Sequence, residues 1–384
     1  MTALVEALRP LVDSRLVPGL VAAVGRGNEL DVVVLGDRAV GGRPMTHDAL
    51  FRIASLTKPM VAASALTLVA DGTLQLDQPV GELLPELAAP VVVRSMTGPV
   101  DDTVPSRQPI TLRHLLTSTN GHGFPSDFSA PVAQLLVERL LQDPPQPQLQ
   151  RVPPPDEWMA ILGGIPLLHQ PGEGFTYNAA FDIVGVLVAR AGGAALPELM
   201  AARLFGPLGM TDTGFAFPGG TDERRTSFYC HGDDRLVEQD DPGGQWATVP
   251  PFPSGAGGLV STVADVVAFQ RMLLGGGGDV LPADLVAAMM TDQLTPAIRS
   301  TDTVFLDGQS WGLGGGVDIA TLHPWNVPGR YGWIGGTGTS AYVVPADGSV
   351  AVLLTQVQLA GPTGNQVIEG FWTAAAEHLG HDRT

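Results

Sequence analysis

The stretch "FRIASLTKPMVAASALTLVADG", residues 51–72, places a serine and a lysine at the start of an apolar helix. Proline lacks a backbone N–H and fits a helix only in its first turn, so Pro59 predicts a helix that begins near Ser55 and ends before Gly72. Because residues three apart in a helix share a face, Lys58 is expected beside Ser55, with about 5 to 6 Å between their Cβ atoms. The helix N-terminus also favours negative charge, which a serine alkoxide or an oxyanion carries.

Lys58 is the only lysine among the 21 basic side chains of the chain. Serine is a weak nucleophile, and lysine can act as its base only if the lysine pKa, ordinarily about 10.4, is depressed by burial or by neighbouring cations. Arginine stays protonated in proteins and cannot take this role. A chain that otherwise uses arginine therefore keeps lysine where a neutral amine is needed. The alternative is that Ser55 only caps the helix and Lys58 is a surface cation, because an S-x-x-K spacing is common by chance.

A second serine motif competes with this one. The segment "GQSWG", residues 308–312, matches the G-x-S-x-G elbow of α/β-hydrolases. That elbow joins a strand to a helix, whereas the glycine-rich run "WGLGGGVDI" follows here. An acidic residue and then a histidine must also follow the serine, and the histidines that remain are His323, His378 and His381. We therefore expect Ser310 to be a loop or strand residue.

The composition describes an ordinary globular protein, with 44% apolar and 16% charged residues. A chain of 384 residues holds a large core and about two domains. Its 39 acidic and 21 basic side chains give a formal charge of −18, which disfavours nucleic acid and anionic membrane surfaces as partners. The sequence contains no apolar run of about 18 residues, so no membrane span is predicted.

The cellular compartment is indicated by two features. The opening "MTALVEALRPLVDSRL" carries charged side chains where an export signal needs an uninterrupted apolar run. Cys230 is the single cysteine, which rules out an internal disulfide and fits a reducing compartment. We therefore expect a cytoplasmic protein. The histidine and aspartates that follow Cys230 lack the spacing of zinc ligands, so no metal site is expected.

The two ends of the chain each offer a helix and a pair of strands. Apolar spacing predicts helices within residues 4–16 and 365–380, and β-rich runs around residues 27–28 and 347–348 predict two hairpins. The simplest packing joins both hairpins into one sheet covered by helices.

The middle of the chain differs from its ends, because helical runs alternate there with loops rich in proline and glycine. This pattern predicts a mostly helical region inserted into the sheet domain. The expected domains are residues 1–85 together with 251–384, and residues 86–250. The segment "DPPQPQLQRVPPP", residues 143–155, is expected to be an extended surface loop.

Six blocks in a fixed order carry a family resemblance. They are "FRIASLTKPMVAASALTLVADGTLQLDQPV", "ITLRHLLTSTNGHGF", "PGEGFTYNAAFDIVGVLVARAGG", "LFGPLGMTDTGF", "GGLVSTVADVVAFQRMLL" and "YGWIGGTGTSAYVVPADGSVAVLLTQ". With these blocks the chain resembles the serine β-lactamase and penicillin-binding-protein superfamily, and is most similar to its class C-like esterases, the family VIII carboxylesterases. The resemblance implies an α/β fold of the α+β type: a central antiparallel sheet flanked by helices, an inserted mostly helical domain, and an active site between the two.

The resemblance assigns catalytic roles to three residues. Ser55 matches the nucleophile that is acylated, and Lys58 matches its partner in the S-x-x-K box. Tyr177, in "FTYNAAF", matches the tyrosine that shuttles protons together with the lysine. A tyrosine acts as a base near neutral pH only beside a cation, and the one lysine would be that cation. Without the flanking match, Tyr177 would be taken for a core or interface aromatic.

Two departures from the family pattern bear on the site. The second box usually reads tyrosine, any residue, asparagine, whereas Asn178 follows Tyr177 directly. Asn178 either fills the asparagine role from a shifted backbone or leaves that role empty. The third box usually begins with lysine, and "WIGG", residues 333–336, is the best match here.

The third box suggests how the substrate is bound. Trp333 would offer an apolar face where many β-lactamases hold a substrate carboxylate with lysine. Gly335 and Gly336 would let the strand approach a bound acyl group, and the N–H groups of Gly336 and Ser55 are the candidate oxyanion hole. Arg330 lies nearby, and it is expected to face solvent rather than to replace the charge of the missing lysine.

The sequence therefore predicts a serine hydrolase that works without a cofactor through an acyl-enzyme, on small neutral carboxylic esters. Within enzymes the alternatives are a β-lactamase, a D-amino-acid amidase or peptidase, and an acyltransferase. Outside enzymes the alternative is a catalytically silent penicillin-binding-like module. The expected partner is a small-molecule ester or amide, and the oligomeric state is left open.

Overall fold

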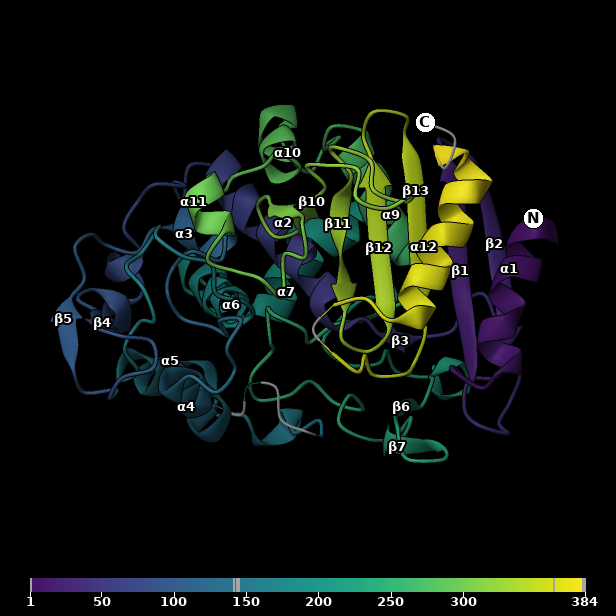
Figure 1. Ribbon diagram of the computed structural model, residues 1–384, viewed down its shortest axis with the longest axis horizontal. Helices are drawn as coiled ribbons and strands as arrows, with labels where there is room; N and C mark the ends of the chain where they lie inside the picture. Colours follow the sequence, from purple (N-terminus) through teal and green to yellow (C-terminus); the bar gives the residue numbers. More distant parts are fainter. Residues whose placement is uncertain (1, 141, 143–145, 362, 382–384) are drawn as a thin grey trace.

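The computed structural model describes residues 2–140, 142, 146–361 and 363–381, and Figure 1 shows it with a sheet at one end and helices at the other. The central sheet has seven strands in the order β2-β1-β13-β12-β11-β10-β9, and every neighbouring pair is antiparallel. Its strands are β1 (Gly19–Arg26), β2 (Glu29–Gly36), β9 (Ser310–Trp311), β10 (Gly316–Val317), β11 (Tyr331–Gly335), β12 (Thr339–Val344) and β13 (Ser349–Leu354).

Both predicted hairpins are confirmed. Strands β1 and β2 are joined through residues 27–28, and β12 and β13 pair across residues 345–348. The pairing of β1 with β13 closes the two ends of the chain into one sheet, as predicted. The termini consequently lie close together at the sheet end of the molecule in Figure 1.

Helices cover both faces of the sheet. Successive residues of a strand point to opposite faces, and this separates the two layers. On β12, the ring of Tyr342 meets the ring of Trp372 in α12 (Gln366–Leu379) at 5.6 Å, whereas Ala341 lies with Phe269 of α9 (Val263–Leu274). Figure 1 accordingly shows α1 (Thr2–Asp13) and α12 in front of the strands and α9 behind them.

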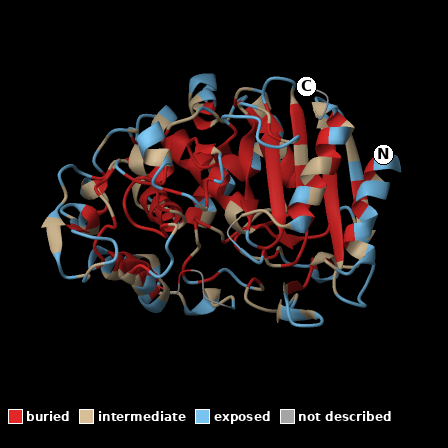
Figure 2. Ribbon diagram, in the orientation of Figure 1, coloured by how far each residue is buried: buried red, intermediate tan, exposed pale blue. Residues whose placement is uncertain are grey.

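Helix α2 (Thr57–Ala70) lies at the centre of the molecule and follows a single 3₁₀ turn at Ala54–Leu56. Every residue from Thr57 to Leu68 is buried, as expected for a helix that is apolar on all sides. It packs against α6 (Ala179–Gly192), which is also buried over most of its length (Figure 2). The helix predicted after Ser55 is thus confirmed, and it joins the sheet to the helical region.

The remaining elements are short. The helices are α3 (Leu112–Leu116), α4 (Pro131–Leu140), α5 (Pro155–Gly163), α7 (Leu196–Met200), α8 (Gly206–Leu208), α10 (Ala283–Met289) and α11 (Pro296–Arg299). Three two-stranded sheets join β3 (Phe51–Arg52) to β8 (Val260–Ser261), β4 (Val91–Val93) to β5 (Thr103–Pro105), and β6 (Phe228–His231) to β7 (Leu236–Asp240). Helices dominate between residues 86 and 250, and the domain limits themselves stay a prediction.

The prediction for Ser310 is confirmed, whereas that for residues 143–155 is only partly met. Ser310 is fully buried in the edge strand β9, and its hydroxyl donates to Asp292, so the strand prediction is confirmed. The segment 143–155 is not simply extended. Its residues 143–145 lie outside the described part, but a 3₁₀ turn forms at Leu149–Arg151. Leu149 packs against a small buried cluster that includes Trp246. That apolar contact holds the second half of the segment against the body of the protein.

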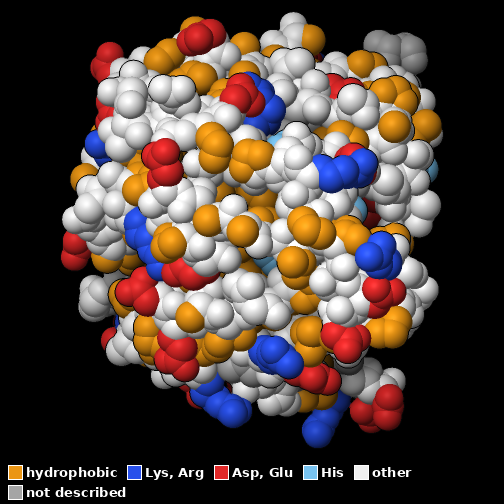
Figure 3. Space-filling model, turned by 90° about the vertical axis from the view of Figure 1, so that its left-hand side faces the viewer, with side chains coloured by type: hydrophobic (Ala, Val, Ile, Leu, Met, Phe, Trp, Pro, Cys, Tyr) orange, Lys and Arg blue, Asp and Glu red, His pale blue; other side chains and the backbone are white. Residues whose placement is uncertain are grey.

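Figure 3 shows the helical end face, where acidic and basic side chains are scattered among hydrophobic ones. Among the described residues, no single helix combines the length and hydropathy that a membrane crossing requires. The pair Ala179–Gly192 and Leu196–Leu208, bent by 79°, passes by length and composition alone.

Candidate active site

Ser55 lies in the 3₁₀ turn between β3 and α2, directly after a strained residue. Ala54 has φ +43°, a left-handed conformation that costs free energy for a residue with a side chain. The strain lets the chain turn sharply out of β3, and it leaves Ser55 only half-buried while Leu56 and Thr57 enter the core. The predicted nucleophile is therefore the accessible residue at the start of a buried helix.

Lys58 is fully buried beneath Ser55. Its Nζ donates to the Ser55 hydroxyl oxygen at 2.8 Å, to Asn178 Oδ1 at 2.9 Å and to the Ala256 carbonyl oxygen at 2.7 Å. A lysine ammonium has three N–H donors, and these three acceptors match them. The lone lysine is thus a core residue in contact with Ser55, and the alternative of a surface cation is wrong.

The ring of Tyr177 lies next to Lys58, and its centroid is 4.5 Å from Lys58 Nζ. Its hydroxyl accepts a hydrogen bond from the indole N–H of Trp333 at 2.6 Å. Phe305 stacks on the ring at 4.4 Å, and Trp311 meets it edge-on at 6.2 Å. These contacts fix the position of the ring and of its hydroxyl beside Lys58.

Asn178 reaches Lys58 from an unusual backbone conformation. It stands just before α6 with φ +84°, which is rare for a residue other than glycine. From this position its Oδ1 contacts Lys58, although it follows Tyr177 one residue earlier than the family pattern has it. Of the two sequence-based alternatives for Asn178, the geometry supports the shifted backbone.

Trp333 is buried, with only 2% of its surface exposed, and its N–H is directed at Tyr177. It does not belong to the wall of either cavity at Ser55. The expectation that its apolar face replaces a lysine toward the substrate is therefore not matched by the geometry. Trp333 contacts the predicted proton shuttle instead.

The two glycines of the third box occupy different surroundings. A Cβ added at Gly335 would lie 2.4 Å from the Ile53 carbonyl oxygen, so this glycine lets β11 pack directly against the segment that leads to Ser55. A Cβ added at Gly336 would meet nothing within 4 Å. Gly336 faces open space beside Ser55, which suits the candidate oxyanion hole.

Two cavities meet at Ser55, and both also touch Asn178, Gly336 and Gln358. The first, of about 330 Å³, is here called the Tyr177 cavity, and its further lining residues include Phe124, Phe128, Tyr177, Phe305, Ile334 and Leu359. The second, of about 240 Å³, is here called the Trp246 cavity, and its further lining residues include Gln142, Leu149, Val152, Trp246, Phe252 and Ser254. Among the described residues, neither wall contains an arginine, lysine or histidine.

Arg330 does not face solvent, contrary to expectation. It is 6% exposed, its Nε lies 2.9 Å from the buried carboxylate of Asp318, and its guanidinium stacks on Tyr342 at 4.1 Å. The ion pair and the aromatic face compensate the loss of water around its charge. Arg330 is thus buried in the interior and does not line either cavity.

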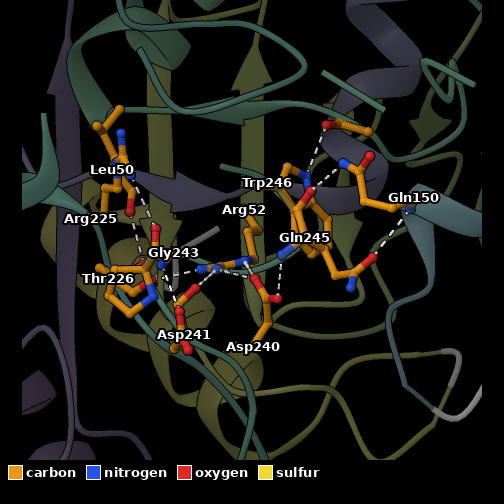
Figure 4. A network of polar contacts seen from close by, with 12 residues as sticks. Leu50, Arg52, Gln150, Arg225, Thr226, Asp240, Asp241, Gly243, Gln245 and Trp246 are labelled. Atoms are coloured by element: carbon orange, nitrogen blue, oxygen red, sulfur yellow. Dashed lines mark hydrogen bonds and ion pairs between the residues drawn. The ribbon is translucent and has the colours of Figure 1, made fainter. Parts of the chain in front are cut away.

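A buried arginine anchors the wall of the Trp246 cavity (Figure 4). Arg52 lies three residues before Ser55 and forms an ion pair with Asp240, and its guanidinium also donates to the Thr226 carbonyl oxygen at 2.6 Å. Its charge sits 5.0 Å from the rings of both Trp246 and Phe217. The segment that ends β7 is therefore tied to the strand that leads to the nucleophile.

Three residues of the site were not predicted from the sequence, namely Gln142, Asp182 and Ala256. Asp182 is the one acidic residue in the apolar helix α6, one turn after Asn178, and this was the available signal. Burial raises the pKa of Asp182, and hydrogen bonds from Ser254, Gln142 and Ala256 oppose the rise. Within the described part of the chain, no cluster of three His, Cys, Asp or Glu side chains is arranged to hold a metal ion.

Comparisons with known proteins agree with this architecture. The family model described as Beta-lactamase matches residues 4–366. Esterase EstB of Burkholderia gladioli is 33% identical over 383 residues, which cover 94% of this chain and 90% of that protein. Uncharacterized protein MT1414 of Mycobacterium tuberculosis is 35% identical over 367 residues, covering 91% and 88%.

The fold is also shared with a solved structure. EstCE1, a hydrolase with promiscuous acyltransferase activity, superposes with a TM-score of 0.82 at 21% identity over 98% of both chains. The antiparallel sheet flanked by helices, predicted from the six sequence blocks, is thereby confirmed. The chain belongs to the Beta-lactamase family.

Proposed function

We propose that this protein is a serine hydrolase that cleaves small neutral carboxylic esters through an acyl-enzyme on Ser55. The observation that carries the proposal is the 2.8 Å contact between Lys58 Nζ and the Ser55 hydroxyl, at the junction of two cavities whose described wall residues include no cation. The similarity to Esterase EstB supports the same reaction class. With its single cysteine, the protein is proposed to work in the reducing cytoplasm.

In the proposed mechanism, Ser55 Oγ attacks the ester carbonyl and its proton passes to Lys58 and Tyr177. The oxyanion of the tetrahedral intermediate accepts hydrogen bonds from the backbone N–H groups of Ser55 and Gly336. Tyr177 returns the proton to the alkoxide oxygen as the bond to the acyl carbon breaks. Water then repeats the sequence on the acyl-enzyme, releasing the carboxylic acid and restoring the Ser55 hydroxyl.

The two cavities divide the substrate between them. The group that leaves must lie beside the residue that protonates it, and Tyr177 lines only one of the two cavities. The alcohol part is therefore assigned to the Tyr177 cavity, with its phenylalanine rings, and the acyl part to the Trp246 cavity. An alcohol that enters the Tyr177 cavity in place of water would turn the enzyme into an acyltransferase, the second candidate function.

The charge of the cavities favours esters over β-lactam drugs. A β-lactam carries a carboxylate near the reacting ring, and no cation among the described wall residues meets it. A hydrogen bond to a charged group is worth about 1.5 to 3 kcal/mol, or roughly ten- to more than a hundredfold in binding. Neutral esters lose nothing by its absence.

The test combines substrate preference with mass spectrometry. Nitrophenyl esters of rising acyl length are compared with a chromogenic cephalosporin, and kcat/KM for the best ester is expected to exceed the cephalosporin value by at least about a hundredfold. The intact protein should gain one acyl group, on the peptide that contains Ser55. Addition of a small alcohol that yields a new ester faster than free acid would favour the acyltransferase.

Two matched serine variants serve as controls. Ser55→Ala should abolish both turnover and acylation, whereas Ser310→Ala, at the competing motif, should keep most of the activity. A folded Ser310→Ala protein without activity beside an active Ser55→Ala protein would overturn the assignment. Equal efficiency toward cephalosporins and esters would point to a β-lactamase instead.

A further inference from the structure

A continuous chain of hydrogen bonds leads from Lys58 through the half-buried Asn178 to a buried carboxylate. Asn178, whose Oδ1 accepts from Lys58, donates through Nδ2 to Gln142 Oε1 at 2.9 Å. Gln142 in turn donates through Nε2 to Asp182 Oδ2 at 2.7 Å. Gln142 and Asp182 are 7% and 1% exposed, so water does not compete freely for these groups.

The carboxylate decides which way the two amides point. An ionised carboxylate can only accept hydrogen bonds, so Gln142 must present its NH₂ group to Asp182 and its oxygen to Asn178. Asn178 must then present its NH₂ group to Gln142 and its oxygen to Lys58. The orientation of the asparagine amide at the predicted base is therefore set two side chains away.

The same carboxylate holds the second acceptor of Lys58. Asp182 Oδ1 accepts from the backbone N–H of Ala256 at 3.0 Å and from the Ser254 hydroxyl at 2.6 Å. The carbonyl oxygen of Ala256 is the group that accepts from Lys58 Nζ at 2.7 Å. Asp182 thus fixes two of the three oxygens around Nζ.

This arrangement directs the lone pair of a neutral lysine. A neutral amine has two N–H donors and one lone pair. If Asn178 Oδ1 and Ala256 O take the two N–H groups, the lone pair is left toward the Ser55 hydroxyl, 2.8 Å away. A reversed Asn178 amide would present N–H groups to that lone pair and compete with Ser55 for it.

We propose that Asp182 and Gln142 are positioning residues that orient the Asn178 amide and thereby aim Lys58 at Ser55. The inference rests on the proposed function, because it concerns the proton acceptor in acylation. Both residues line the Trp246 cavity, but their hydrogen bonds go to each other, to Asn178, to Ser254 and to Ala256 rather than to Ser55. Their effect is exerted through Asn178 and Ala256.

The test exchanges the carboxylate of Asp182 and the amide of Gln142, first singly and then together. In Asp182→Asn, the side-chain oxygen must still accept from Ala256, so the new NH₂ group faces Gln142 and both amides must reverse. The acylation rate with a nitrophenyl ester should fall about ten- to a hundredfold, as expected for the loss of a hydrogen bond to a charged group. Gln142→Glu alone sets two carboxylates side by side and should also impair acylation. The double variant Asp182→Asn/Gln142→Glu restores an acceptor facing Asn178 and should recover most of the lost rate, which a merely structural role would not do.

Further variants keep the test decisive. Gln142→Leu breaks the connection while Asp182 keeps its contacts with Ser254 and Ala256, so it should lower acylation without unfolding the protein. Asp265→Asn is the matched control, since Asp265 also accepts a backbone N–H and a hydroxyl but lies on α9, and it should leave acylation unchanged. A folded Asp182→Asn or Gln142→Leu protein within about threefold of the parent rate, or a double variant no faster than either single one, would overturn the inference. Failure of the parent protein to acylate would instead reject the proposed function.

Discussion

Lys58 combines full burial with three oxygen acceptors around its Nζ, and its titratable amine is the property that arginine lacks. Replacement of Lys58 by arginine keeps the positive charge and removes the base. The expected loss in kcat is about 10² to 10⁴, as for a lost general base. Stopped-flow acylation with nitrophenyl acetate measures it, and melting curves show whether the larger side chain is tolerated. A near-normal rate would mean that Lys58 supplies only charge.

Trp333 offers a separate test, because its N–H contacts the hydroxyl of Tyr177. Trp333→Phe keeps an aromatic ring beside Trp311 but removes the donor. A neutral hydrogen bond contributes about 1 kcal/mol, so kcat should fall by roughly five- to tenfold while KM changes little, since Trp333 lies outside both cavity walls. The control is Trp372→Phe on α12, which loses a comparable N–H bond to the Ser340 hydroxyl instead of to Tyr177. Equal losses in both variants would indicate a general packing effect.

The end of β11 packs against the segment that leads to Ser55. Of its two glycines, Gly335 is closely packed and Gly336 faces open space, so replacing each one tests a different role. In Gly335→Ala the new methyl group would collide with the Ile53 carbonyl oxygen, and backbone cannot yield as a side chain can. The expected cost is about 1 to 3 kcal/mol of stability together with lost activity. Gly336→Ala meets open space, so its melting temperature should stay near that of the parent protein while the methyl group obstructs the site. Calorimetry and ester turnover on both variants test this, and equal destabilisation would contradict it.

The stability of the whole protein should depend on pH through His122. This side chain is fully buried, and desolvation lowers its pKa to about 4, while its Nε2 contacts the Ile165 carbonyl oxygen at 2.9 Å. Because the unfolded histidine has a pKa near 6.5, the unfolded chain binds more protons between about pH 6.5 and 4. The corresponding stability is present above about pH 6.5 and is lost as the pH falls toward 4, in total about 3 kcal/mol.

Denaturant unfolding at several pH values checks this dependence. His122→Gln removes the titration and keeps an N–H for Ile165, so its free energy of unfolding should fall less steeply between pH 6.5 and 4 than that of the parent protein. His231→Gln, at an exposed position, is the matched control and should leave the slope unchanged. An identical slope in the His122 variant would assign the acid sensitivity to other groups.

Local sequence was enough for the elements whose geometry depends on near neighbours. The proline after Lys58 placed the helix start, and the turns at residues 27–28 and 347–348 placed both hairpins, because turn and cap preferences act within a few residues. The pairing of Ser55 with Lys58 followed from helical spacing alone. These features of the fold and the site were determined by the sequence itself.

Tertiary structure decided the features that depend on residues distant in the chain. Arg330 turned inward because Asp318 and Tyr342 meet it there, and Trp333 turned to Tyr177 across 156 positions of sequence. No local pattern specifies the left-handed backbone of Asn178 or its connection through Gln142 to Asp182. Buried polar groups must find partners wherever the fold brings them, so their choice is made by packing of the whole chain rather than by the spacing of its residues.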